Sequence, residues 1–462
     1  MSAEVSASPA DSGRSPLDKV RALQHTLYRA AKADPGRRFH ALWDKVLRRD
    51  VLWRAWVAVR KNKGAPGVDR ITLADVEEYG VTRLLDELAD ELRRGEYRSL
   101  PARRVFIPKP GTNEQRPLSI PAVRDRIVQA ALKIVLEPVF EADFAACSFG
   151  FRPRRGMHDG LQVVIDEAWR GRRWVVETDI ASCFEAIPKD RLMQAVQERV
   201  ADQSVLKLLR AMLRAGVMET GVVRHPVTGT PQGGVISPML CNVYLHRLDR
   251  QWNTREHGVL VRFADDLLVM CVSREQAEAA LARLRLLLDE LGLVSKESKT
   301  RIVHLVEGDE GFDFLGFHHK LVRSRGARGK RGVAFLSRWP ADKAMRHARD
   351  RIRELTQRSR LRFAIEAVVE DLNRFLNGWA GYYRFGHSTI RLGKIRHYAL
   401  ERLAIFIGER YKSRRRRAYG LSVLAFRSAD QYGLVTLNGI VVAPRAGKPW
   451  REKPNAGGER RR

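Results

Sequence analysis

The chain has 462 residues, a formal net charge of +30 and 44% hydrophobic residues, which permits a folded core and excludes wholesale disorder. No stretch approaches the roughly 18 consecutive apolar residues of a membrane helix. Residues 1–16 lack the basic start and apolar centre of a secretory signal, so we expect a cytoplasmic protein. The four cysteines lie far apart without a CxxC pair, which disfavours a zinc module or a disulfide framework.

The positive charge is concentrated in the C-terminal third. From Lys320 to the end the net charge is +24 over 143 residues, whereas residues 1–319 carry only +6. So large an excess favours a nucleic-acid partner, whose phosphates the basic segment would contact.

The first third is predicted to be mainly helical, because apolar residues recur there at helical spacing. In chain order we predict a helix over 17–59, a loop over 61–69, a helix to about residue 94, strands over 104–107 and 117–120, and a helix over 123–140 that ends near Pro138.

The middle of the chain mixes short β-type runs with helices, which is typical of an α+β domain with a small sheet. In chain order we predict a strand over 174–178, helices over 191–214 and 237–250, strands over 259–264 and 267–272, a helix over 275–291, and strands over 300–305 and 312–317. From residue 341 the pattern becomes helical, with helices over 361–386 and 391–411. We find no internal repeat.

Three aspartates stand at the ends of apolar runs. Asp265 and Asp266 separate two predicted strands, as a hairpin turn would, and Asp179 ends another strand. A pair of aspartates alone is most often an ordinary polar turn. Two strands that deliver carboxylates to one point would instead form an oxygen-ligand site for two Mg²⁺, which suits nucleotidyl transfer.

Several further segments occur in an order that strengthens this interpretation. They are RVFIPKPGTNEQRPLSIP, SFGFRP, TDIASCF, TPQGGVISPML, RFADD and FDFLGF. Together they resemble the reverse transcriptase/maturase proteins of bacterial group II introns, over roughly residues 40–440. The upstream segment KNKGAPGVD resembles the N-terminal extension of this family, and RFLNGWAGYYRFG resembles a signature of its maturase domain.

The resemblance implies an α+β fold of the right-hand polymerase type, with fingers and palm followed by an all-helical thumb or maturase (X) domain. The expected parts are a disordered tail over 1–16, the N-terminal extension and start of the fingers over 17–100, fingers and palm over 101–320, the thumb over 321–440, and a basic flexible tail over 441–462.

Each site residue is carried over from a matching motif. Asp179, Asp265 and Asp266, with the backbone carbonyl of Ile180, match the catalytic metal ligands, and Lys299 matches a lysine proposed to protonate pyrophosphate. The remaining matches are Lys109, Arg116, Phe184, Gln232 and Gly233 for the incoming nucleotide, with Phe184 as the ring that would exclude a ribose, and Phe314, Leu315, Gly316 and Phe317 for the primer grip.

In the thumb, basic side chains are the expected RNA contacts. They are Arg346, Arg349, Arg353, Arg414, Arg415, Arg416 and Arg417. Trp379, Tyr382 and Tyr383 recur at helical spacing and are interpreted as packing residues rather than base-stacking ones.

The resemblance further implies two Mg²⁺ ions, for which Mn²⁺ could substitute, with dNTPs, an RNA template with a DNA primer, the group II intron RNA and target DNA as partners. Phe263 replaces the family's usual tyrosine, and Glu185 stands where aspartate is commoner. We expect no HNH endonuclease domain, as in the class C layout that the sequence resembles. Two alternatives stay open: a splicing-only maturase, and a host-adopted relative used in DNA repair or phage defence.

Overall fold

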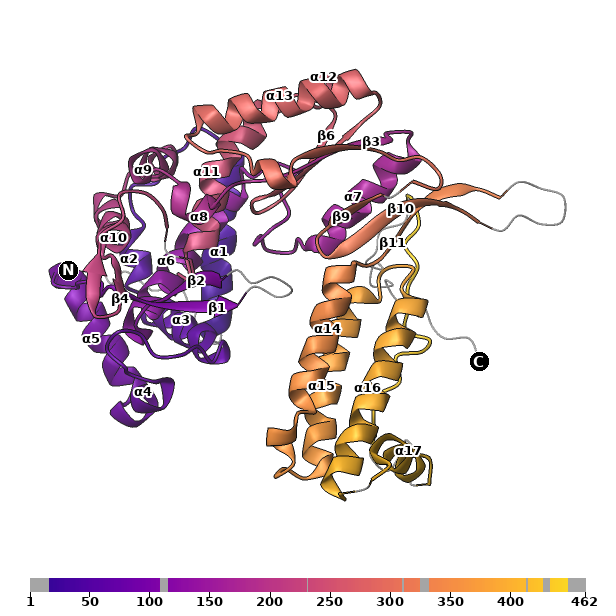
Figure 1. Ribbon diagram of the computed structural model, residues 1–462. Coiled ribbons are helices and arrows are strands. Elements are labelled where there is room, and N and C mark those ends of the chain that lie inside the picture. Colours follow the sequence, from indigo (N-terminus) through magenta and orange to yellow (C-terminus); the bar gives the residue numbers. More distant parts are fainter. Residues whose placement is uncertain are drawn as a thin grey trace, which may run out of the picture.

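A computed structural model of the chain describes residues 16–108, 115–230, 232–309, 311–324, 332–412, 414–426 and 433–447. Helices and small sheets alternate through the first part, and a helical bundle follows, so the predicted α+β class is confirmed. Figure 1 shows the bundle (orange to yellow) below the sheet β9–β11, opposite the hairpin β1–β2.

The N-terminal part is a cluster of helices. They are α1 (Pro16–Ala33), α2 (Trp43–Val46), α3 (Arg49–Lys61), α4 (Leu73–Tyr79) and α5 (Val81–Arg94). The prediction of one helix over 17–59 is wrong. A turn at Pro35–Gly36 follows α1, and the Asp202 carboxylate accepts hydrogen bonds of 2.8 Å from the backbone N–H groups of Leu42 and Trp43, at the start of α2.

The fingers contain a four-stranded sheet with the order β2-β1-β4-β5. Its strands are β1 (Ala102–Pro108), β2 (Gln115–Ile120), β4 (Val217–Glu219) and β5 (Val222–Arg224). Helix α6 (Val123–Glu141) is buried on almost all sides and continues past Pro138. The hairpin β4–β5 was not predicted, because its strands of three residues are too short to show a periodicity.

The palm sheet has the order β6-β7-β3-β8 and carries the aspartates. Its strands are β3 (Trp174–Asp179), β6 (Val259–Phe263), β7 (Asp266–Cys271) and β8 (Arg301–His304). The helices of this region are α7 (Met157–Trp169), α8 (Cys183–Ala186), α9 (Lys189–Gln197), α10 (Gln203–Arg214), α11 (Ser237–Gln251), α12 (Thr254–His257) and α13 (Arg274–Glu290). The helix predicted over 191–214 is two helices, because the Asp202 side chain caps α10.

The palm sheet separates two hydrophobic cores. Alternate residues of a strand face opposite sides, so Val176 packs into the core shared with the N-terminal helices, α11 and α13, whereas Val175 packs into the core shared with α7 and the thumb. The catalytic strands are therefore held from both sides.

A three-stranded sheet joins palm and thumb, and residues 433–447 run back to the palm. The sheet consists of β9 (Phe312–Phe314), β10 (Phe317–Arg323) and β11 (Ala334–Pro340), and the thumb helices are α14 (Asp342–Leu355), α15 (Ile365–Tyr383), α16 (Thr389–Arg410) and α17 (Arg416–Phe426). The single strand predicted over 312–317 is wrong, since a turn divides it. The expected domain boundary at 320/321 falls inside β10.

Candidate active site

The three aspartates meet at one end of the palm sheet. Strands β3 and β7 are antiparallel, and Asp179 lies directly opposite Asp266 in their register. Asp265 occupies the tight turn between β6 and β7, where its carbonyl accepts a hydrogen bond of 3.3 Å from the N–H of Ile180. The structure thus brings together the predicted metal-ligand residues from two separate strands.

A buried polar network holds this turn. Arg262 is fully buried, donates two hydrogen bonds to Asp249 at 2.8 and 2.6 Å, and donates to Asn242, to Ser148 and to the carbonyl of Ala264. Ala264 has a φ of +56°, in the left-handed region that is costly for a residue with a side chain. The donated hydrogen bond stabilises that conformation.

The SFGFRP motif packs against the same turn. An added Cβ on Gly150 would lie 2.5 Å from the backbone nitrogen of Ala264, so only glycine fits this approach. The amide of Asn242 donates a hydrogen bond of 2.7 Å to the Gly150 carbonyl, and Ser148 accepts from Arg262. The motif therefore acts as a support for the aspartate turn.

Asp179 and Asp265 line a cavity of about 740 Å³ between palm and fingers, whereas Asp266 is not among its lining residues. Of the predicted residues, Arg116, Asp179, Ile180, Gln232, Asp265 and Lys299 line it. The lining also includes residues that the sequence analysis did not assign to the site, among them Arg104, Glu185, Lys296, Ser298 and Lys343. Lys343 precedes the predicted Arg346 by three residues, so helical spacing puts both on one face of α14, but no sequence pattern shows that this face borders the cavity.

The carboxylates repel one another in a poorly solvated place. Burial raises the pKa of Asp265, and the nearby Asp179 raises it further. Burial likewise raises the pKa of Asp266 to about 7, with added repulsion from Asp265 and Asp179. Groups of this kind need a cation to stay ionised together.

Lys299 supplies part of that positive charge. Its ammonium forms an ion pair with Asp179, and although burial alone would lower the pKa of Lys299, this pairing raises it. Among the described residues no group of three or more His, Cys, Asp or Glu side chains is already arranged around a metal position. The donor chemistry nevertheless fits a hard divalent cation, because carboxylate and carbonyl oxygens are the ligands that Mg²⁺ prefers.

Gln232 and Gly233 of the motif TPQGG lie beside the fingers. Gly233 has a φ of +105°, and an added Cβ would lie 2.4 Å from the Ser119 carbonyl oxygen, so glycine is required here by packing. The Gln232 amide donates a hydrogen bond of 3.2 Å to Glu185. Phe184 is partly buried against the core and does not line the cavity. Lys109 lies outside the described residues.

The predicted primer grip is the turn between β9 and β10. Leu315 and Gly316 have φ values of +48° and +77°, whereas Phe314 and Phe317 point into the core. The hydroxyl of Tyr382 donates a hydrogen bond of 2.7 Å to the Leu315 carbonyl. Trp379 and Tyr383 are buried in the same core, so their interpretation as packing residues is confirmed.

The predicted RNA-binding arginines fall into two groups on the thumb. Arg346 and Arg353 are exposed on α14 and Arg349 is half-buried there, and Arg353 pairs with Asp350. Arg414 and Arg415 precede α17. Arg416 and Arg417 lie on α17 and pair with Glu409 and Glu401.

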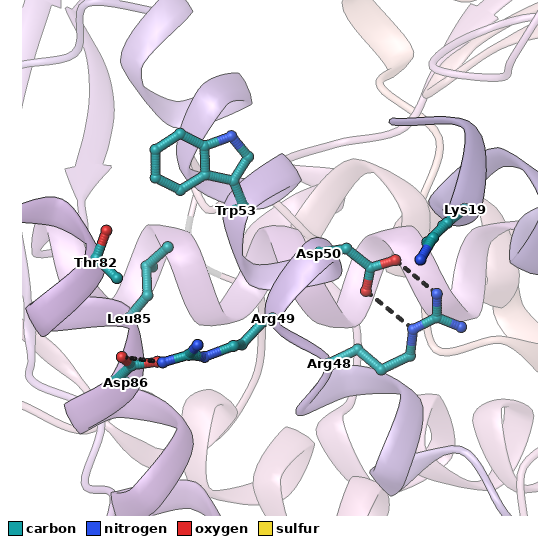
Figure 2. A pocket seen from close by; sticks show the side chains of 8 residues that line it. All are labelled: Lys19, Arg48, Arg49, Asp50, Trp53, Thr82, Leu85 and Asp86. Carbon is teal, nitrogen blue, oxygen red and sulfur yellow. Dashed lines mark hydrogen bonds and ion pairs between the residues drawn. The ribbon is translucent and has the colours of Figure 1, made fainter. Parts of the chain in front are cut away.

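Another pocket lies among the N-terminal helices α1, α3 and α5. Figure 2 shows Trp53 above a hollow of about 630 Å³, with Arg49 paired to Asp86 and Arg48 paired to Asp50. None of the predicted site residues lines this pocket, and Arg48 and Arg49 are both paired with carboxylates.

Within the described ranges, no helix has the length and apolar character to cross a membrane. Two family models match the chain. Residues 107–319 match "Reverse transcriptase (RNA-dependent DNA polymerase)", and residues 345–420 match "Group II intron, maturase-specific domain".

Three curated relatives agree with these matches. The chain is 35% identical over 369 residues to Protein YkfC of Escherichia coli, covering 71% of this chain and 94% of that protein. It is 36% identical over 214 residues to the group II intron-encoded protein LtrA of Lactococcus lactis, covering 46% of this chain and 35% of LtrA. An uncharacterised 91 kDa protein in the cob intron of Schizosaccharomyces pombe is 27% identical over 84% of this chain and 57% of its own length.

The chain thus spans nearly all of one relative but only about a third to a half of the other two. A reverse transcriptase domain and a maturase domain follow one another in the same order as the palm and thumb of the structure. The chain belongs to the family of group II intron reverse transcriptases with a maturase domain.

Proposed function

We propose that the protein copies RNA into DNA at the Asp179–Asp265–Asp266 site, with two Mg²⁺ ions, and that it binds its group II intron RNA to assist splicing and retrohoming. The observation that carries this proposal is the register of β3 and β7, which puts Asp179 opposite Asp266 with Asp265 in the adjoining turn. Asp179 at the end of β3 and Asp265 in the turn before β7 line one cavity, with Asp266 beside them, and nucleotidyl transfer needs such a group of carboxylates.

The side chains around the cavity have separate tasks. Mg²⁺ held by the three aspartates and the Ile180 carbonyl would activate the primer 3′-hydroxyl and stabilise the departing pyrophosphate. Arg116 extends from β2 into the cavity, where its planar guanidinium suits phosphate oxygens. Lys299, once released from Asp179, can give a proton to the pyrophosphate.

The thumb supplies the second half of the proposal. Lys343 lines the catalytic cavity, and Arg346 and Arg353 are exposed further along α14. These cations suit a nucleic-acid backbone that leaves the cavity along the thumb. The group II intron RNA, a DNA primer on an RNA template, dNTPs and target DNA are the proposed partners.

The test compares substitutions that remove one charge without changing shape. Asp179→Asn and Asp265→Asn should each reduce Mg²⁺-dependent primer extension on an RNA template by at least about a thousandfold, while affinity for intron RNA stays close to wild type. Asp289→Asn, on the exposed face of α13, is the matched control. Primer extension near the wild-type rate by either active-site variant would refute the assignment.

A further inference from the structure

A further pocket, which is basic, lies beside α9 and α10. Helices α9 and α10 and the end of β5 enclose about 440 Å³. Its polar lining consists of Lys189, Asp190, Arg210, Arg214 and His225, with Val227 on the rim. None of these residues has a role in the proposed catalytic site.

Among the described residues the cations of this pocket form no ion pair, although the Asp190 carboxylate lines the same pocket. In the described part of the chain, no carboxylate lies within ion-pair distance of Lys189, Arg210 or Arg214, although most other clustered arginines are paired. The Lys189 ammonium donates to the carbonyl of Pro226, and burial together with the charge of Arg214 lowers the pKa of Lys189. Cations held together in this way favour an anion between them.

The start of α9 adds an independent contribution. The helix begins at Lys189 after Pro188, and no side chain caps its first N–H groups. Such a helix end attracts phosphate, because the free N–H groups and the helix dipole both favour negative charge. Val227 is 88% exposed beside it, an apolar surface that suits a sugar or base attached to that phosphate.

The position of the pocket indicates which phosphate it would hold. Gln232, in the cavity at the aspartates, follows Pro226 by six positions, a span of at most about 20 Å. Two residues between them are held by hydrogen bonds, since Thr228 donates to the Glu185 carbonyl at 2.8 Å and the Thr230 N–H donates to the Phe184 carbonyl at 2.7 Å.

Figure 1 shows α9, α10 and β4 on the fingers side, away from the thumb and from the turn β9–β10. If the primer and its duplex lie at that turn and the thumb, the strand still to be copied must enter from the fingers. We propose that the pocket of Lys189, Arg210 and Arg214 binds backbone phosphates of the unpaired template strand ahead of the copied base. This inference rests on the proposed polymerase function.

The experiment varies the template overhang. One primer duplex carries either a single unpaired template nucleotide or an RNA overhang on the order of twelve nucleotides. Arg210→Gln, Arg214→Gln and the double variant are compared with wild type and with Lys207→Gln, a control that removes one exposed charge elsewhere on α10. Inorganic tripolyphosphate serves as a competitor without a nucleic-acid strand.

We expect the KM of the double variant for the long-overhang template to rise roughly fivefold to tenfold relative to its KM for the short one. The slope of log affinity against log salt should flatten by about 0.7 for each arginine removed. Lys207→Gln should leave the ratio of the two KM values as in wild type.

Two outcomes would overturn the inference. Equal effects on both templates, or none, would show that the pocket does not touch the unpaired strand. Altered inhibition by tripolyphosphate with an unchanged overhang dependence would assign the pocket to free polyphosphate instead. A wild-type protein that extends neither primer would contradict the proposed function itself, and direct binding of the overhang RNA would still decide the pocket.

Discussion

Removal of Asp249 should destabilise the palm more than removal of any exposed charge. The change Asp249→Ala leaves the fully buried guanidinium of Arg262 without the one carboxylate that it contacts among the described residues, while the bonds to Asn242, Ser148 and the Ala264 carbonyl remain. Loss of one partner from a buried ion pair costs about 3–5 kcal/mol. For a folding unit of roughly 200 residues this corresponds to a melting temperature about 6–20 °C lower.

The assay is thermal unfolding of the full chain, followed by circular dichroism, in parallel with primer extension at a temperature where both proteins remain folded. Arg274→Gln breaks an exposed ion pair with Glu278 on α13 and should change stability by no more than about 0.5 kcal/mol. The double variant Arg262→Met/Asp249→Leu should regain most of the lost stability, because it removes both buried charges.

The double variant also separates stability from positioning. It lacks the donor to the Ala264 carbonyl, so the turn that carries Asp265 loses its support, and primer extension should stay well below wild type. A melting temperature of Asp249→Ala close to wild type would refute the energetic argument. Full activity in the double variant would refute the positioning role of Arg262.

Two further predictions concern the thumb and the acid side of the stability curve. Replacement of Arg414–Arg417 by glutamine should weaken binding of intron RNA and flatten the salt slope by up to about two units, since two of the four already pair with Glu401 and Glu409; a salt titration with unchanged slope would contradict this. Burial lowers the pKa of His246 to about 4, so this residue contributes stability above its unfolded pKa that is lost as the pH falls towards 4. Between pH 7 and pH 5, the free energy of unfolding in urea should therefore fall by about 1 kcal/mol less for His246→Phe than for wild type; the difference is kept this small because the ring is only partly buried. Equal falls in the two proteins would contradict that reasoning.

Strands and helices with a clear period were predictable from the sequence. The palm strands β6 and β7 follow from short continuous apolar runs, which are buried on both faces of the sheet, and α13 and α15 follow from apolar residues at helical spacing. The points at which the predicted helices 17–59 and 191–214 are interrupted were not predictable, because they depend on contacts between residues distant in sequence. Asp202 starts α2 from 160 residues away, and no local pattern around Leu42 shows it.

Some residues of the candidate site were likewise predictable from the sequence and others were not. The aspartates could be named because strand ends and motif order indicate them, whereas Arg262 looks like an exposed residue of a hairpin until its partners Asp249 and Ser148 are known. Lys343 was missed because the thumb enters the catalytic cavity only in three dimensions. The roles assigned to the nucleotide and RNA contacts stay predictions.

The return of residues 433–447 changes how the thumb can move. The segment runs along α15, where Asn373 donates to the Gly433 carbonyl and Val442 N–H donates to the Arg384 carbonyl, and it ends on α7, where Gln162 donates to the Arg445 carbonyl. The bundle is thus fastened to the palm at both of its chain ends, through β11 and through this strap. A domain attached at two places can rotate about the line that joins them, but it cannot rotate freely about a single hinge. If a template–primer duplex lies between palm and thumb, as proposed, this double attachment limits how far the thumb can move away from it.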